Sequence, residues 1–247
     1  MSSIPSAELV DGRKTFIPLE NNPEVLSYLC SNLGISPSLT FHDVFSTSLD
    51  LLALIPRPIN AIILLTEWPI YNATRSAMEP TIPEYQGSGP NEPVIWIKQT
   101  IGHACGLMAL LHCIFNLDGG RYILPGSTLG KIREESIPLK PHLRAKLLYD
   151  SMFLEEAHMK AASAGASRAP SPRDENHHHF IGFVQKDGEV WELNGGMNGP
   201  LLRGKLLDGD DLLSERGLAM TVQGFLDEAA KGGFGEMSIV AIAGAES

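Results

Sequence analysis

The residues with the clearest capacity for chemistry surround Cys105. Small residues flank this cysteine at positions 102, 104 and 106, and apolar residues with helical spacing follow it from position 107 to 115. This spacing predicts a buried helix whose first turn contains Cys105. Because free N–H groups and the positive end of the helix dipole favour an anion there, we expect the thiol to ionise near neutral pH and to act as a nucleophile.

Gln99 lies six residues before Cys105. From there its side-chain amide can turn back toward the sulfur and, with the backbone N–H of Cys105, bind the oxyanion of an acyl-transfer reaction. The alternative is a buried, unreactive cysteine, because cysteine is among the most buried residue types. A base that approaches the thiol would favour the catalytic interpretation.

A predicted β-hairpin supplies such a base. Residues 178–184 and 189–193 alternate as strands do, and the turn sequence Gln-Lys-Asp-Gly at 185–188 joins them. His179 begins the first strand and Asn194 follows the second, so antiparallel pairing should bring their side chains together. A thiol, an imidazole and an amide that orients the imidazole form a papain-like Cys–His–Asn set.

The roles expected within this set follow from the chemistry of each group. Cys105 would attack an acyl carbon, while His179 would take the thiol proton and later deliver one to the leaving group. Asn194 would accept a hydrogen bond from the imidazole and fix its tautomer. Gln99 would help to stabilise the oxyanion.

The three consecutive histidines at 177–179 raise the question of a metal site. Successive residues of a strand point to opposite faces, so at most two of these side chains can converge. No HxxxH or CxxC spacing accompanies them. We therefore expect no metal and no cofactor.

The rest of the chain predicts an α+β fold, because helices and about six strands follow one another without regular alternation. Asn22 and Pro23 should begin a helix that Gly34 ends. Residues 1–14 are expected to fray, and the weakly patterned stretch 66–93 to form a connection or a partly helical excursion. The other predicted helices span 49–54, 128–135, 141–150 and 221–231, and the other predicted strands span 39–45, 61–65 and 237–243.

The low-complexity stretch 161–176 should be a mobile loop within one domain, 1–247, because too little chain follows it to build a second core. The 247 residues carry a formal net charge of -10, which argues against nucleic acid and suits a basic protein partner, although it also serves solubility. No apolar run is long enough for a membrane span, and no secretory signal is evident. Three cysteines without framework spacing indicate reduced thiols in a cytosolic or nuclear compartment.

Several motifs in order give the chain a resemblance to a known family. The sequence resembles the ubiquitin C-terminal hydrolases, small papain-like deubiquitinases, from about residue 16 to residue 243. The motifs that carry the resemblance are 16–25 (FIPLENNPEV), 55–58 (IPRP), 98–101 (KQTI), 104–106 (ACG), 126–129 (GSTL), 134–136 (EES), 179–181 (HFI), 187–188 (DG) and 192–193 (EL).

The resemblance implies a monomeric thiol hydrolase that cleaves after the C-terminal glycine of ubiquitin and releases small adducts or short peptides. It assigns Cys105 as nucleophile, His179 as proton donor and Gln99 as oxyanion residue. Residues of about 156–177 would form a crossover loop above the threaded C-terminal tail of ubiquitin. The implied fold is papain-like, with a central antiparallel sheet of about six strands flanked by helices and a knotted backbone.

One position departs from the family, which normally has aspartate where this chain has Asn194. An amide can orient His179 but cannot stabilise an imidazolium with a full charge. Glu192 is no evident substitute, since it lies two residues away, roughly 7 Å along the strand. Two alternatives stay open: a hydrolase of a ubiquitin-like modifier such as NEDD8, and a weakly active ubiquitin-binding protein.

Overall fold

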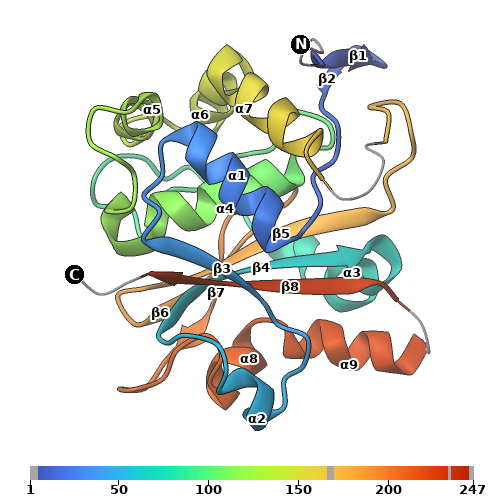
Figure 1. The fold of residues 1–247 in the computed structure, drawn as a ribbon, viewed down its shortest axis with the longest axis vertical. Helices are drawn as coiled ribbons and strands as arrows, with labels where there is room; N and C mark the ends of the chain where they lie inside the picture. Colours follow the sequence, from blue (N-terminus) through green and yellow to red (C-terminus); the bar gives the residue numbers. More distant parts are fainter. Residues whose placement is uncertain (1–4, 166–169, 233–234, 245–247) are drawn as a thin grey trace.

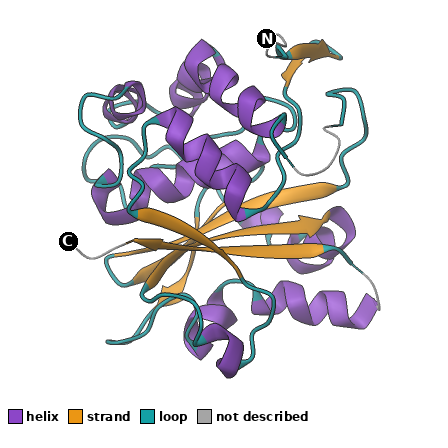
Figure 2. Cartoon of the chain, viewed as in Figure 1, coloured by secondary structure: helices purple, strands orange, loops and turns teal. Residues whose placement is uncertain are grey.

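A six-stranded antiparallel sheet divides the molecule into two layers of helices (Figures 1 and 2). The computed structural model describes residues 5–165, 170–232 and 235–244. Across the sheet, the strand order is β3, β8, β4, β5, β6, β7. These strands are β3 (Leu39–Asp43), β8 (Met237–Gly244), β4 (Ile59–Glu67), β5 (His178–Lys186), β6 (Glu189–Leu193) and β7 (Leu201–Lys205).

The helices cover both faces of this sheet and enclose two hydrophobic cores. One face carries α1 (Pro23–Leu33), α4 (Cys105–Asn116), α5 (Thr128–Ser136), α6 (Pro141–Tyr149) and α7 (Met152–Ala162). The other carries α2 (Leu49–Leu52), α3 (Trp68–Arg75), α8 (Glu215–Met220) and α9 (Gln223–Gly232). Short 3-10 turns lie at Glu79–Thr81 and Leu117–Gly120.

The continuous apolar run in β4 explains why the sheet is buried on both sides. Ile62 and Leu64 belong to one core, and Ala61 and Ile63 belong to the other. Because successive residues of a strand face opposite ways, a strand between two cores needs apolar residues at every position. The prediction of a doubly buried strand at 61–65 is confirmed.

Helix α4 packs closely on β5 because position 182 is glycine. A Cβ there would lie 2.9 Å from the backbone oxygen of Ala109, one turn after Cys105. His179 lies three residues before Gly182 on the same strand. The close packing therefore fixes the first turn of α4 relative to the start of β5.

Several local predictions are confirmed by the end caps of the helices. The Asn22 side chain accepts a hydrogen bond from the Val25 N–H at 2.8 Å, and Gly34 ends α1 with a φ of 78°. Ser127 caps α5 through the Gly130 N–H at 3.1 Å. The 187–188 turn has positive φ at both residues, as a tight hairpin requires.

The prediction that residues 1–14 fray is wrong for positions 8 to 14, while residues 1–4 lie outside the described part. Here β1 (Glu8–Val10) and β2 (Arg13–Thr15) form a hairpin. The Arg13 guanidinium donates to the Thr100 backbone oxygen at 2.9 Å, and Thr15 pairs with Gly102. The turn of the hairpin is Asp11-Gly12, with φ of 51° and 78°, so an Asp-Gly dipeptide was a local signal that the sequence prediction overlooked.

The crossover loop begins later than the expected position of about 156. Residues up to Ala162 belong to α7, which Ser151 caps through the Leu154 N–H at 3.3 Å. The connection to β5 therefore runs from 163 to 177, and its residues 166–169 lie outside the described part, together with the mobility predicted for them. The knotted path implied by the resemblance stays a prediction.

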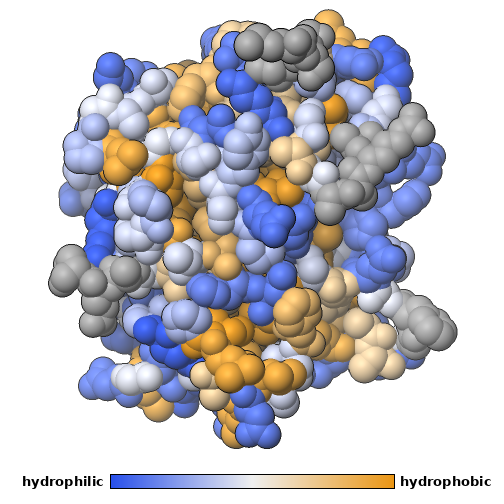
Figure 3. Space-filling view, viewed as in Figure 1, coloured by the Kyte–Doolittle hydropathy of each residue, from blue (hydrophilic) through white to orange (hydrophobic). Residues whose placement is uncertain are grey.

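The surface is mixed, with apolar side chains gathered at the α2 end of the molecule (Figure 3). Phe45, Leu49 and Leu54 are each more than three-quarters exposed. This surface lies on the side of the sheet opposite α4. No helix in the described part of the chain is long and apolar enough to cross a membrane.

Candidate active site

One cavity of about 630 Å³ brings together residues that are far apart in the sequence. Gln99, Cys105 and His179 all line it, as the sequence predicts for a shared site. Other walls come from the β1–β2 hairpin, the start of α3, the loop residues Pro172 to Asn176, and the segments just before α4 and just after β6. Arg173 in that loop pairs with Glu8 of β1 at 2.8 Å, which links two walls of the cavity.

Asn194 lies behind His179 and bonds to it, which confirms the predicted contact at the ends of the hairpin. His179 Nε2 lies 2.9 Å from Asn194 Oδ1. The backbone N–H of Gly196 donates to the same oxygen at 2.8 Å, and Asn194 Nδ2 donates to the Tyr71 hydroxyl at 2.9 Å. Because a backbone N–H can only donate, Gly196 identifies the atom facing His179 as the amide oxygen.

This bonding sets the tautomer of the imidazole. An amide oxygen can only accept, so His179 Nε2 must carry the proton and donate it to Asn194. In the neutral ring Nδ1 is then unprotonated, which leaves a basic nitrogen to receive a proton. The arrangement suits a general base.

Aromatic rings enclose the imidazole from two sides. The His179 ring stacks on Trp68, with centroids 4.7 Å apart and planes 25° from parallel, and meets the Tyr71 ring edge-on at 4.9 Å. Burial lowers the pKa of His179 to about 4, although the bond to Asn194 opposes this shift. The resting imidazole is therefore neutral near pH 7.

Cys105 is the first residue of α4, as predicted, but it is not poised as a thiolate. Burial raises the pKa of the Cys105 thiol, and the backbone of Phe180, the first turn of the helix and the Arg13 charge only partly oppose this. The expectation of ionisation near neutral pH is wrong for this arrangement because only 6% of the residue is exposed. Among the described residues, no hydrogen bond joins the thiol to His179. Catalytic hydrogen bonds are often long without substrate.

Gln99 is held beside the hairpin end through its backbone. Its N–H donates to the Gly195 oxygen at 2.9 Å, and a Cβ on Gly195 would lie 3.1 Å from that nitrogen. The side-chain Nε2 donates to the Ile101 oxygen at 3.0 Å. Because an amide NH₂ has two hydrogens, one remains for an oxyanion.

Glu192 does not take the place of the absent aspartate. It is fully buried and forms an ion pair with Arg75, with Nη2 and Oε2 2.7 Å apart, while Arg203 lies 3.7 Å away. Its charge is therefore already paired, away from His179.

The sequence analysis did not identify Trp68 and Tyr71 as parts of the site. Their spacing of three, within a segment that begins Trp-Pro, signals a short helix.

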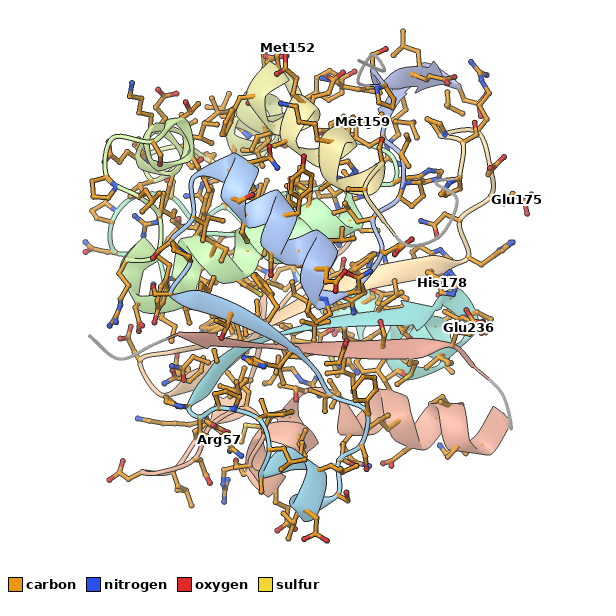
Figure 4. All side chains as sticks on the ribbon, viewed as in Figure 1. Arg57, Met152, Met159, Glu175, His178 and Glu236 are labelled. Atoms are coloured by element: carbon orange, nitrogen blue, oxygen red, sulfur yellow. The ribbon has the colours of Figure 1, made fainter. Side chains whose placement is uncertain are left out.

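The three consecutive histidines take three different partners, although alternation along a strand would have allowed two of them to converge. His177 faces Glu175 at 3.5 Å, His178 faces Glu236 at 3.4 Å, and His179 bonds to Asn194. Figure 4 shows His178 and Glu236 close together near the end of the sheet. With Glu67, they place three possible ligand atoms within 4.8 Å of one another. Pairing at a partly exposed surface accounts for this group.

Comparisons with known proteins assign the family. A sequence profile described as ubiquitin carboxyl-terminal hydrolase, family 1, matches residues 16–227. The chain belongs to this family. Its members are cysteine-type deubiquitinating hydrolases, so the thiol–imidazole–amide arrangement occurs in a chain of the matching class.

Individual relatives support this family assignment along most of the chain. A ubiquitin carboxyl-terminal hydrolase of Aplysia californica is 34% identical over 192 residues, which cover 76% of this chain and 86% of the relative. The hydrolase YUH1 of Saccharomyces cerevisiae is 30% identical over 223 residues, 87% of this chain and 90% of the relative.

The fold is shared with a solved family structure. The catalytic domain of Trichinella spiralis UCH37, bound to ubiquitin vinyl methyl ester, superposes with a TM-score of 0.69 at 19% identity. The match covers 95% of this chain and 97% of the other. The predicted papain-like α+β fold, with its six-stranded antiparallel sheet, is confirmed.

Proposed function

We propose that this protein is a thiol hydrolase that cleaves after the C-terminal glycine of ubiquitin and releases small adducts or short peptides. The observation that carries the proposal is the shared cavity of Gln99, Cys105 and His179, backed by the 2.9 Å bond from His179 to Asn194. Family membership supplies the substrate class. Relatives of the chain carry the name ubiquitin carboxyl-terminal hydrolase.

Acylation begins with a proton transfer from Cys105 Sγ to His179 Nδ1. The thiolate attacks the carbonyl carbon of the terminal glycine, and the resulting oxyanion accepts hydrogen bonds from Gln99 Nε2 and the Cys105 N–H. His179 then gives the proton to the leaving amine, and the C–N bond breaks. The product is a thioester between Cys105 and ubiquitin.

Deacylation uses the same groups in reverse order. His179 Nδ1 takes a proton from water, the hydroxide attacks the thioester, and the proton returns to the departing thiolate of Cys105. Asn194 keeps the imidazole in one orientation through both half-reactions. Before the first proton transfer, substrate binding must bring the thiol and imidazole into hydrogen-bonding geometry, because no hydrogen bond joins them among the described residues.

The size of the leaving group is set by the connection from α7 to β5. Its described residues 172–176 line the cavity, so a tail that reaches Cys105 passes beside them. A connection of this length should exclude folded leaving groups. Inserting a few tens of Gly/Ser residues at its exposed Pro170 should admit larger conjugates. An unchanged size limit would show that this connection does not restrict the leaving group.

Charge should assist the approach of ubiquitin. The formal net charge is -10, and Asp11, Asp174 and Glu175 lie on the cavity wall. Their carboxylates would attract the basic face and arginine-containing tail of ubiquitin. Raising ionic strength should then slow association, and a rate independent of salt would argue against this contribution.

We further propose that the protein acts as a monomer in the cytosol or nucleus.

Fluorogenic conjugates test the substrate assignment directly. Hydrolysis of a ubiquitin conjugate should exceed hydrolysis of the matching NEDD8 conjugate, and Cys105→Ala should abolish both. Faster NEDD8 hydrolysis would transfer the assignment to that modifier. Tight ubiquitin binding without turnover would instead identify a binding protein.

A further inference from the structure

The amide of Asn194 makes more hydrogen bonds than orienting one imidazole requires. Asn194 is only 1% exposed, and its oxygen accepts from both His179 and the Gly196 N–H. Its Nδ2 donates to the Tyr71 hydroxyl at 2.9 Å, the only acceptor for this nitrogen among the described residues. A buried amide N–H without an acceptor is destabilising, so Tyr71 favours the orientation that presents oxygen to His179.

The face of the imidazole is covered by Trp68 from the same short helix. The two rings are stacked at 4.7 Å, and His179 is only 5% exposed. An indole face attracts a cation, and the attraction is stronger where water is excluded. Trp68 can therefore favour the imidazolium that forms when the Cys105 proton reaches Nδ1.

We propose that Trp68 and Tyr71 together do for His179 what a carboxylate at position 194 would otherwise do. Tyr71 orients the neutral amide, and Trp68 stabilises the imidazolium charge that the amide cannot neutralise. Both are positioning residues, since they act through Asn194 and His179. The inference rests on the proposed role of His179 as general base.

The pairing of Tyr71 with Asn194 has a consequence that a purely structural role lacks. A carboxylate has no N–H that needs an acceptor, and its two oxygens are equivalent. An aspartate at 194 would therefore present an oxygen to His179 with or without Tyr71, whose hydroxyl would then serve only as a donor. The effect of removing the hydroxyl should therefore depend on whether residue 194 is an amide or an acid.

A double-mutant cycle measures this dependence. Tyr71→Phe alone should lower kcat about tenfold with little change in KM. Combined with Asn194→Asp, it should lower kcat less than threefold relative to Asn194→Asp alone. Equal losses in both backgrounds would overturn the role of Tyr71. Tyr85→Phe, which removes a hydroxyl bonded to Glu92 at 3.2 Å, is the matched control and should leave kcat unchanged.

The titration of His179 tests the role of Trp68 without any ubiquitin substrate. Several charged or titratable groups face His179 or line its cavity, and each can influence the measurement: Asp11, Arg13, Tyr71, His103, Cys105, Arg173, Asp174, Glu175 and His178. ¹⁵N NMR of labelled histidine, assigned with His179→Gln, reads both the tautomer and the protonation of this ring. These groups are the same in every variant, so a difference in the pKa of His179 between variants measured under one condition reports the effect of Trp68.

The wild-type spectrum should show the neutral ring with its proton on Nε2. Trp68→Leu should lower the pKa of His179 further, and Trp68→Phe, which keeps a weaker aromatic face and serves if the leucine variant unfolds, should give an intermediate shift. Trp191→Phe, which changes a mostly buried indole on β6, is the matched control. An unchanged titration in folded Trp68 variants, or a proton on Nδ1 in the wild type, would overturn the inference. The NMR titration of His179 needs no turnover. Failure to hydrolyse ubiquitin conjugates would therefore contradict the proposed function and not the role of Trp68.

Discussion

The two reactive side chains of the site differ in how firmly the molecule holds them. His179 is bonded to Asn194 at 2.9 Å and stacked on Trp68 at 4.7 Å. Cys105 has its place at the start of α4, but among the described residues its thiol makes no hydrogen bond to the imidazole. The base is therefore organised before substrate arrives, while the hydrogen bond between thiol and base must still form.

This difference follows from what surrounds each group. The wall behind His179 consists of sheet and helix, whereas Cys105 faces a cavity bounded by a hairpin and a long connection. Burial raises the thiol pKa and lowers the imidazole pKa, so both groups rest in their neutral forms. Removing support from the His179 side should accordingly cost more than altering the approach to Cys105.

The largest effect is expected from removing the base itself. His179→Ala should lower kcat about a thousandfold, because general acid–base catalysis contributes on that scale. Steady-state hydrolysis of a fluorogenic ubiquitin conjugate measures the loss. His177→Ala, an exposed neighbour paired with Glu175, is the control and should retain full activity. Comparable losses for both variants would remove His179 from the mechanism.

The second-largest loss of activity is expected from disturbing the close contact between Gly195, after β6, and Gln99. Gly195→Ala places a Cβ 2.9 Å from the Gln99 Cβ, so the oxyanion donor or the Asn194 segment must shift. We expect kcat to fall about thirtyfold, less than the roughly hundredfold to thousandfold loss on removing an oxyanion donor, because here the donor is displaced and not deleted. Gly232→Ala, where a Cβ meets nothing within 4 Å, provides the comparison. Unchanged kcat for Gly195→Ala would mean that this close approach is unimportant.

The acid limb of the pH–rate profile reports the state of His179. Its pKa is lowered from an ordinary 6.5 to about 4, so the neutral base persists as pH falls and kcat/KM should decline only near pH 4. An acid limb near 6.5 would contradict this.

The stability of the fold also changes over this pH range, so loss of folded enzyme must be separated from loss of activity. The unfolded state binds the histidine proton first as pH falls through 6.5, so stability decreases from there toward 4, and His112 and His158 add to the loss. Between pH 7 and pH 5 the thermal midpoint should drop by at least about 5 °C. Rates should therefore be taken from short incubations of folded enzyme.

The smallest effect is expected on the Cys105 side. The Arg13 charge favours the thiolate but is only a minor influence on its pKa. Arg13→Gln should slow alkylation of Cys105 by iodoacetamide about threefold at neutral pH, as a small rise in pKa requires. Arg216→Gln, which alters an ion pair with Asp210, serves as control. If Arg13→Gln slowed alkylation by a factor as large as the loss of kcat in His179→Ala, the proposed difference between the two sides of the site would be wrong.

The sequence predicts the parts of this site that local patterns encode. Apolar periodicity locates the helix after Cys105, and strand alternation with a tight turn locates His179 beside Asn194. The docking of the β1–β2 hairpin and the protonation state of the Cys105 thiol are less accessible, because they depend on partners such as Thr100 and Phe180 that only folding brings near. The aromatic wall of α3 was missed for the same reason, since its neighbours lie on β5 and after β6.

A ubiquitin bearing a C-terminal electrophile tests the central claim most directly. Intact-mass and peptide analysis should find one ubiquitin per chain, attached to Cys105, and none on Cys105→Ala. No adduct on the folded wild type, or an adduct at Cys30 or Cys113, would contradict the assignment of Cys105 as the nucleophile.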